Sequence, residues 1–246
     1  MIIAIDGPAG SGKSTIAKNV ACKLGFQYLD TGAMYRAVAV LAQRQGIEFD
    51  DGEALGALTQ DAPIEFGFTE GDPLPSRVFI AGIEVTDEIR TPQIDRAVSP
   101  VSAQPSVRSA LVGQQRILGT QGDYVVEGRD IGTVVFPDAE VKVFLTAGPQ
   151  ERARRRAAQN LERGLETDYE TIFADIIRRD EYDSSRDVSP LKAADDAHEI
   201  DSTMMTIEYV TDRIVGLARD AGATYKTSEM NEACDSREAC DCEERA

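Results

Sequence analysis

The sequence predicts an α/β fold in which a parallel five-stranded sheet is flanked by helices. Short apolar runs alternate along the chain with stretches of helical period, which is typical of strand-helix-strand units. A glycine-rich segment follows the first apolar run and opens the first helix. The chain has 246 residues, 42% of them hydrophobic, so one large domain can bury a full core without disulfides or metals.

The first strand is predicted at residues 2–5 and the second at residues 27–30. Between them, Ile16, Val20 and Leu24 recur at four-residue spacing on one face of a helix, and Gly25 ends it. A second helix is predicted from near Thr31 to residue 46.

Residues 63–85 have a different period, because apolar and polar residues alternate as in half-exposed antiparallel strands. This pattern predicts a small β-rich insertion in the strand-helix-strand chain. A helix follows at residues 105–118, then strands at 123–130, 141–147 and 197–201. Arginine-rich helical stretches occupy residues 151–163 and 169–180.

Residues 205–222 predict a closing amphipathic helix. Its apolar face is expected to carry Ile207, Val210, Ile214 and Leu217. His198 is the single histidine, and it is expected to be packed in the last strand rather than to act as a base.

The charge balance limits the partners of the chain. A net charge of −17 and a pI near 4.5 repel nucleic acid and anionic membranes, so we expect neither as a partner. Apolar runs are too short to cross a membrane, and the N-terminus lacks the features of a signal peptide, which together predict a cytoplasmic protein. No apolar stripe is left for a partner helix, so a monomer is expected.

Residues 225–246 predict an acidic, disordered tail whose cysteines lack the ligands for a metal site.

The segment GPAGSGKS at residues 7–14 matches the pattern G-x-x-x-x-G-K-[ST] without a mismatch. Glycines at these positions let backbone N–H groups cradle phosphate oxygens, and the N-terminus of the following helix adds partial positive charge. Lys13 is expected to reach the β- and γ-phosphates, and the Ser14 hydroxyl to bind Mg²⁺. Nucleoside triphosphate binding follows from this motif in its strand-to-helix context.

The loop alone does not show whether the γ-phosphate is hydrolysed or passed to a small molecule. A GTPase switch is disfavoured because the chain has no N-K-x-D element. A kinase needs a second anion site, and Arg36, Arg129 and the arginines of residues 150–163 are candidates. Those last arginines also fit a solvated helix face, which is common in proteins.

Several segments together closely resemble the bacterial cytidylate kinase family: GPAGSGKST, YLDTGAMYR, VTDEIRT, EGRDIGTVVFPDA and RRDEYDSSRDVSPL. The resemblance implies a P-loop NTPase core at residues 1–46, 105–148 and 187–224. It also implies a β-rich insertion that binds the nucleoside monophosphate (NMP), at about 47–104, and a helical lid at about 149–186. It further implies transfer of the γ-phosphate of ATP to CMP or dCMP, with Mg²⁺, to give CDP or dCDP and ADP.

By matched position, the resemblance also implies the site residues. The ATP-binding residues are expected to be Gly7, Pro8, Ala9, Gly10, Ser11, Gly12, Lys13, Ser14, Thr15, Arg152 and Arg156. The CMP-binding residues are expected to be Thr31, Tyr35, Arg36, Ser99, Arg108, Arg129, Asp130, Arg179 and Asp183. Lys13, Arg129 and Arg186 are the expected catalytic residues, and Glu127 is expected to hold Mg²⁺ through water, beside Ser14.

Other interpretations stay open at this point. A P-loop kinase for UMP, AMP or shikimate shares most of these features, and an ATP- or GTP-binding regulator with a recruiting tail shares the phosphate loop. Tyr35 also fits a buried core position, and Asp183 fits a turn. A pairing of Asp130 with Arg108 is our hypothesis for reading the amide edge of cytosine.

Overall fold

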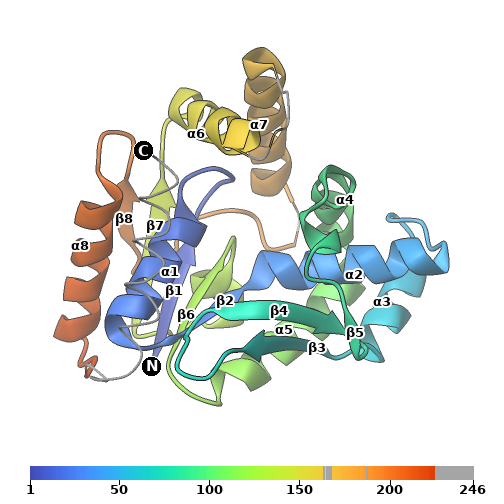
Figure 1. The fold of residues 1–246 in the computed structure, drawn as a ribbon, viewed down its shortest axis with the longest axis horizontal. Helices are drawn as coiled ribbons and strands as arrows, with labels where there is room; N and C mark the ends of the chain where they lie inside the picture. The colour runs from blue at the N-terminus through green and yellow to red at the C-terminus, as the bar shows by residue number, and fades with distance from the viewer. Residues whose placement is uncertain (163, 165–167, 187, 225–246) are drawn as a thin grey trace.

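The computed structural model describes residues 1–162, 164, 168–186 and 188–224 of the chain. Its main sheet has five parallel strands in the order β2-β6-β1-β7-β8 (Figure 1). The strands are β1 (Ile2–Asp6), β2 (Gln27–Asp30), β6 (Tyr124–Gly128), β7 (Val141–Thr146) and β8 (His198–Asp201). The predicted parallel five-stranded sheet is therefore confirmed. Arg163 and the predicted tail at residues 225–246 lie outside the described residues.

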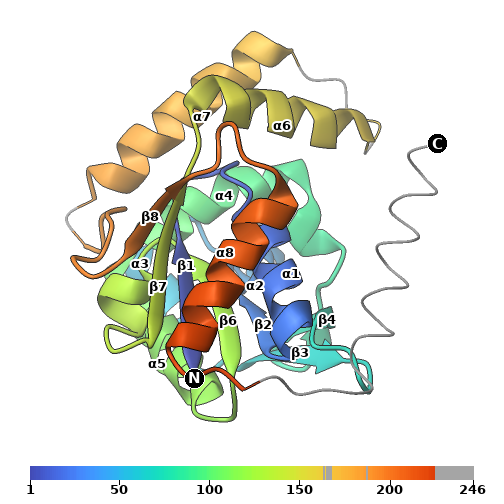
Figure 2. The ribbon, with the colours of Figure 1, turned by 90° about the vertical axis from the view of Figure 1, so that its left-hand side faces the viewer.

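Two hydrophobic clusters cover the two faces of this sheet. On one face, Ile3 and Ile5 of β1 pack with α1 (Lys13–Leu24) and α8 (Ile207–Asp220). On the other face, Ala4 packs in a cluster with α2 (Thr31–Gln45) and α5 (Pro105–Gly119). Alternate residues of β1 thus point to opposite faces, as the strand geometry requires. Figure 2 shows α1 and α8 together on one side of the sheet.

The predicted helix limits agree with the caps in the structure. Gly25 ends α1 in a left-handed conformation at φ 67°, and Gly46 ends α2 in the same way at φ 69°. The buried face of α8 differs from the predicted one, because Ile207 is 48% exposed while Thr211, Val215 and Ala218 are buried beside Val210 and Ile214. The buried face of α8 therefore includes residues one position after the predicted ones, such as Thr211 and Val215.

The insertion contains the predicted antiparallel strands. They are β3 (Ile64–Phe68), β4 (Pro75–Ile80) and β5 (Ile83–Glu84), and they form a separate three-stranded sheet. Two helices that the sequence did not predict lie before and after them, α3 (Gly52–Gln60) and α4 (Pro92–Ala103), and a 3₁₀ turn, η1 (Glu88–Arg90), precedes α4. Asp51 and Thr91 cap these helices through their side chains, which is the local signal for their starts.

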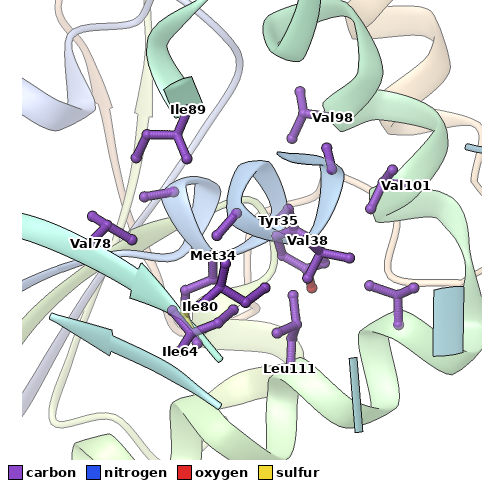
Figure 3. Close-up of a cluster of buried hydrophobic side chains, with 14 of the residues drawn as sticks. Met34, Tyr35, Val38, Ile64, Val78, Ile80, Ile89, Val98, Val101 and Leu111 are labelled. Carbon is purple, nitrogen blue, oxygen red and sulfur yellow. The ribbon is translucent and has the colours of Figure 1, made fainter. Parts of the chain in front are cut away.

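The insertion shares one hydrophobic core with the main sheet. Figure 3 shows Met34 and Val38 of α2 among Ile64 and Ile80 of the small sheet and Leu111 of α5. All five side chains are buried. The insertion is thus fixed to α2, the helix that carries Arg36.

Two helices, expected to form the lid, lie above the carboxyl ends of the parallel strands (Figures 1 and 2). They are α6 (Pro149–Glu162) and α7 (Tyr169–Ser184), and they share a small hydrophobic cluster of Ala153, Ile172 and Ile176.

His198 is exposed, so the prediction that it is packed was wrong. It begins β8, which forms an edge of the sheet and therefore has one open side. No helix among the described residues has the length and apolar character needed to span a bilayer.

Leu111 provides a test of the shared core. Leu111→Ala removes a side chain with no exposed surface, and we expect it to lower the free energy of unfolding by about 2–5 kcal/mol. Ile117→Ala is the matched control on the same helix, because Ile117 is 63% exposed. Urea denaturation of both variants checks this, and an equal loss in the two would contradict the packing described here.

Candidate active site

The phosphate loop connects β1 to α1 at the carboxyl end of the central strand. Gly7 is required there, because a Cβ at this position would lie 2.0 Å from the backbone oxygen of Leu145. Across the loop, the Lys13 Nζ donates a hydrogen bond to the Pro8 backbone oxygen at 2.7 Å. Burial and the charge of Arg129 lower the pKa of Lys13 well below its ordinary value, although the charges of Glu127 and Asp6 oppose this fall. An anion bound in the loop would stabilise its charge.

Glu127 at the end of β6 links the phosphate loop to two neighbouring strands. Its Oε2 accepts from the Ser14 hydroxyl at 3.0 Å, and its Oε1 accepts from the Tyr28 hydroxyl of β2. Burial and the charge of Asp30 raise the pKa of Glu127, while Lys13 opposes that rise. The carboxylate is therefore held in place by hydroxyl donors on both of its oxygens.

Ser14 and Glu127 fit the ligand preference of Mg²⁺. A hydroxyl and a carboxylate oxygen lie side by side, and Mg²⁺ typically takes one or two such protein ligands together with substrate phosphates and water. Within the described part of the chain, no group of three or more His, Cys, Asp or Glu residues is placed to bind a metal by itself. The donor set thus suits a metal that arrives with a phosphate ligand.

Asp183 joins two of the expected catalytic arginines. Its Oδ2 accepts from the Arg129 Nε at 2.9 Å, and its Oδ1 accepts from the Arg186 Nη2. Burial raises the pKa of Asp183, but the charges of Arg129, Arg186 and Arg179 outweigh burial and lower it overall. The carboxylate is ionised and holds two guanidiniums together at the end of β6. The structure therefore places Asp183 between arginines rather than in a simple turn.

Arg36 and Arg179 extend this cationic cluster. The Arg36 Nε donates to Asp95 Oδ1 at 3.2 Å, and its Nη1 lies 3.7 Å from Asp30 Oδ2. Burial and the charge of Arg129 lower the pKa of Arg179 to about 10, and its buried Nε has no hydrogen-bond partner among the described residues. A half-buried guanidinium whose Nε has no partner, beside other arginines, favours an anionic ligand.

The Thr31 hydroxyl, expected to face an acceptor phosphate, donates instead to the Glu127 backbone oxygen at 2.6 Å. It is buried, and buried hydroxyls take a partner within the protein.

Arg108 and Asp130 form the ion pair that the sequence analysis proposed. The Arg108 Nη2 donates to Asp130 Oδ2, both side chains are buried, and the guanidinium lies 5.6 Å from the centre of the Tyr35 ring. Tyr35 is buried in the core as the alternative reading expected, and burial raises its pKa to about 12. The Arg108 Nη1 donates to the Ser102 backbone oxygen at 3.3 Å, three residues along the chain from Ser99, which is expected to read the cytosine.

Two arginines of α6 lie against the phosphate loop, whereas Arg154 is 71% exposed and pairs with Glu151, as a solvated face would. Arg152 is buried, donates to the Ala9 backbone oxygen at 3.1 Å and pairs with Asp180, whereas Arg155 donates to the Ser11 backbone oxygen at 3.3 Å. Arg156, which was expected beside ATP, pairs instead with Asp95 of α4 at 2.8 Å. Arg155 is thus the second arginine at the phosphate loop. The spacing of arginines in the sequence did not show whether Arg155 or Arg156 would lie there.

Asp6 is a site residue that the sequence analysis missed. Its two carboxylate oxygens accept from the backbone N–H groups of Ile131 and Gly132, each at 2.8 Å. These residues open the short π-helical segment η2 (Ile131–Val135) that follows Asp130. Asp6 therefore ties the start of the phosphate loop to the loop that carries Arg129 and Asp130. Its position at the end of β1 was the available signal, since ligands of parallel sheets lie at strand ends.

Comparison with known proteins gives consistent matches over nearly the whole described chain. The family model described as Cytidylate kinase matches residues 3–220. A cytidylate kinase from Geobacillus sp. is 49% identical over 89% of this chain and 96% of its own length. Those from Exiguobacterium sibiricum and Enterococcus faecalis are 51% and 50% identical, each over 89% of this chain and over 97% and 96% of their own lengths.

Asp6 should make stability depend on pH in a defined direction. Burial raises the pKa of Asp6 from 3.8 to about 6, against the lowering effect of the two N–H donors. Because the folded pKa lies above the unfolded value, the stability that Asp6 contributes is full below the unfolded pKa. It is lost as the pH rises through the folded pKa, by about 3 kcal/mol in total.

Asn does not titrate, so wild type and Asp6→Asn should respond differently to pH. We expect the stability advantage of the wild type over the variant to shrink by roughly 2–3 kcal/mol between about pH 4 and pH 7. Urea denaturation at both pH values measures this difference. A difference that stays constant would show that Asp6 does not titrate in this window.

Proposed function

The chain belongs to the cytidylate kinase family, and we propose that its site transfers the γ-phosphate of ATP to the phosphate of CMP or dCMP, giving ADP and CDP or dCDP. The observation that carries this proposal is the closeness of two anion-seeking regions. Glu127 accepts from Ser14 of the phosphate loop, and Arg129, two residues further along the chain, pairs with Asp183 beside Arg186. A donor phosphate held by the loop and an acceptor phosphate held by the arginines would then be neighbours.

On the donor side, we assign the triphosphate to the loop of residues 7–15. Backbone N–H groups of the loop and the N-terminus of α1 supply the donors, and Lys13 neutralises the β- and γ-phosphates. Arg152 is assigned to ATP, and we add Arg155, because both contact backbone oxygens of the loop. The assignment of Arg156 to ATP is replaced by the different role argued below.

On the acceptor side, we assign the CMP phosphate to Arg36 and Arg129, with Thr31 and Tyr35 forming its surroundings. Arg179 and Asp183 are assigned to the sugar. Arg186 is assigned to the transferring phosphates, because Asp183 holds it beside Arg129. Assignment of Ser99 to the cytosine has no contact in its support, whereas the backbone oxygen of Ser102 lies at Arg108.

The chemistry requires positioning and charge stabilisation more than acid–base catalysis. An acceptor phosphate oxygen attacks the γ-phosphorus, and the bond from that phosphorus to the β–γ bridging oxygen breaks. The acceptor is already an oxyanion, so no strong base is needed. Negative charge spreads over the transferring group in the transition state, where Lys13, Arg129 and Arg186 neutralise it. Mg²⁺, when bound through Ser14 and through water on Glu127, supplies further charge neutralisation at the phosphates.

The domain assignment follows the same division of roles. We propose residues 1–46, 105–148 and 187–224 as the core, residues 47–104 as the acceptor-binding insertion and residues 149–186 as the lid. Burial of insertion residues against α2 supports a firm link of the insertion to the core. The lid is linked to the core mainly through polar contacts of Arg152 and Arg155, which suit a part that opens for substrate exchange.

The first test is ADP release from ATP and Mg²⁺ with a panel of acceptors: CMP, dCMP, UMP, AMP, GMP and shikimate. We expect CMP and dCMP to stimulate release far more than the others. Stimulation by AMP or shikimate would assign the site to another small-molecule kinase. Slow release that no acceptor stimulates would favour an ATP-binding regulator.

Asp130 provides a test of base recognition. Asp130→Asn replaces a carboxylate that we assign to the amino edge of cytosine, and loss of a hydrogen bond with a charged acceptor costs roughly 1.5–3 kcal/mol. We therefore expect the ratio of kcat/KM for CMP to that for UMP to fall by roughly 10- to 100-fold. Because a ratio does not depend on the fraction of folded enzyme, an unchanged ratio would exclude Asp130 as a base-reading residue.

A further inference from the structure

Asp95 is a carboxylate that the sequence did not single out and that lies between two parts of the site. It belongs to the first turn of α4, whose N-terminus is capped by Thr91. Its Oδ1 accepts from the Arg36 Nε at 3.2 Å, and its Oδ2 accepts from the Arg156 Nη2 at 2.8 Å. One carboxylate thus joins α2 of the core, α4 of the insertion and α6 of the lid, which lies above α4 in Figure 2.

The two arginines differ in what else holds them. Arg36 has a second carboxylate, Asp30, at 3.7 Å. In the described part of the chain, by contrast, Arg156 makes an ion pair with Asp95 alone. The neighbouring lid arginines, Arg152 and Arg155, contact the core and not α4. The pair of Arg156 with Asp95 is therefore the described ion pair that links the lid to the acceptor-binding insertion.

We propose that Asp95 is a positioning residue that couples binding of the acceptor phosphate to closure of α6. Asp95 gives up Arg36 to the phosphate and keeps Arg156. This inference rests on the proposed function, because it takes Arg36 as a ligand of the acceptor phosphate. No step of phosphoryl transfer passes through Asp95.

The direction of the coupling follows from how the carboxylate is shared. In the structure, Asp95 divides its negative charge between two guanidiniums. A phosphate at Arg36 provides that arginine with a more highly charged, bidentate partner. The Asp95 carboxylate is then available to Arg156 alone, which strengthens the contact between lid and insertion. Acceptor binding and lid closure over ATP therefore favour each other, and the coupling is reciprocal.

The absolute affinity for CMP is a poor readout of this role. Removing the Asp95 charge frees Arg36 for the phosphate but also releases the side chain from its position. In addition, Asp95 is one of the carboxylates whose charge stabilises Arg179. The ratio of CMP affinities with and without a bound ATP analogue isolates the coupling, because a merely structural effect would change both affinities equally.

The experiment is calorimetric titration of the full chain with CMP, in the absence and presence of a saturating non-hydrolysable ATP analogue and Mg²⁺. For the wild type, we expect the analogue to tighten CMP binding at least about fivefold. For Asp95→Asn and for Arg156→Gln, which break the pair from opposite sides, the ratio should fall to within about twofold of one. The double variant should show no further loss, because both changes remove the same interaction.

Arg154→Gln is the matched control. Arg154 lies on the same helix and pairs with Glu151 on the surface, so its removal should leave the wild-type ratio intact. The inference is overturned if the wild type shows no coupling, if Asp95→Asn keeps the wild-type ratio, or if the single variants lose CMP affinity equally in both states. Absence of any CMP binding by the wild type would instead contradict the proposed function itself.

Discussion

The site depends on buried and half-buried carboxylates that hold arginines of like charge close together. Asp183 holds Arg129 and Arg186, and Asp95 holds Arg36 together with a lid arginine. Without these acceptors, guanidiniums so near one another would repel and turn toward solvent. Because each carboxylate serves two arginines, the cluster keeps unsatisfied attraction for an anion. A phosphate would therefore bind in a geometry that the protein's own side chains already hold.

The parallel sheet brings the carboxylates and the phosphate loop to one place. Asp6 of β1 lies opposite Gly128 of β6, so the loops that follow both strands start side by side. Asp6 then binds the backbone of the second loop directly, and Glu127 binds Ser14 of the first helix. Each link joins residues more than a hundred positions apart. An acidic chain can thus build a local cationic site without a basic surface.

Much of the fold was predictable because period and caps are local signals. The phosphate loop and the strand limits followed from motifs and spacing, whereas the pairing of Arg108 with Asp130 was a hypothesis that started from the family resemblance. The role of Asp95 did not, since only the packing of α4 against α2 brings it to Arg36. The distinction between Arg155 and Arg156 depends in the same way on how α6 is rotated, and spacing on one helix does not contain that information. Helices α3 and α4 were missed because their apolar faces are short.

The central claim is that a second anion site lies beside the phosphate loop and is built for a phosphate on a nucleoside. Binding of CMP and of cytidine to the wild-type protein, compared by calorimetry at fixed low salt, tests it most directly. With several arginines in the site, we expect CMP to bind at least about 100-fold more tightly than cytidine, and that advantage to shrink as salt is added. Equal affinity for the two would show that the arginine cluster does not bind the acceptor phosphate.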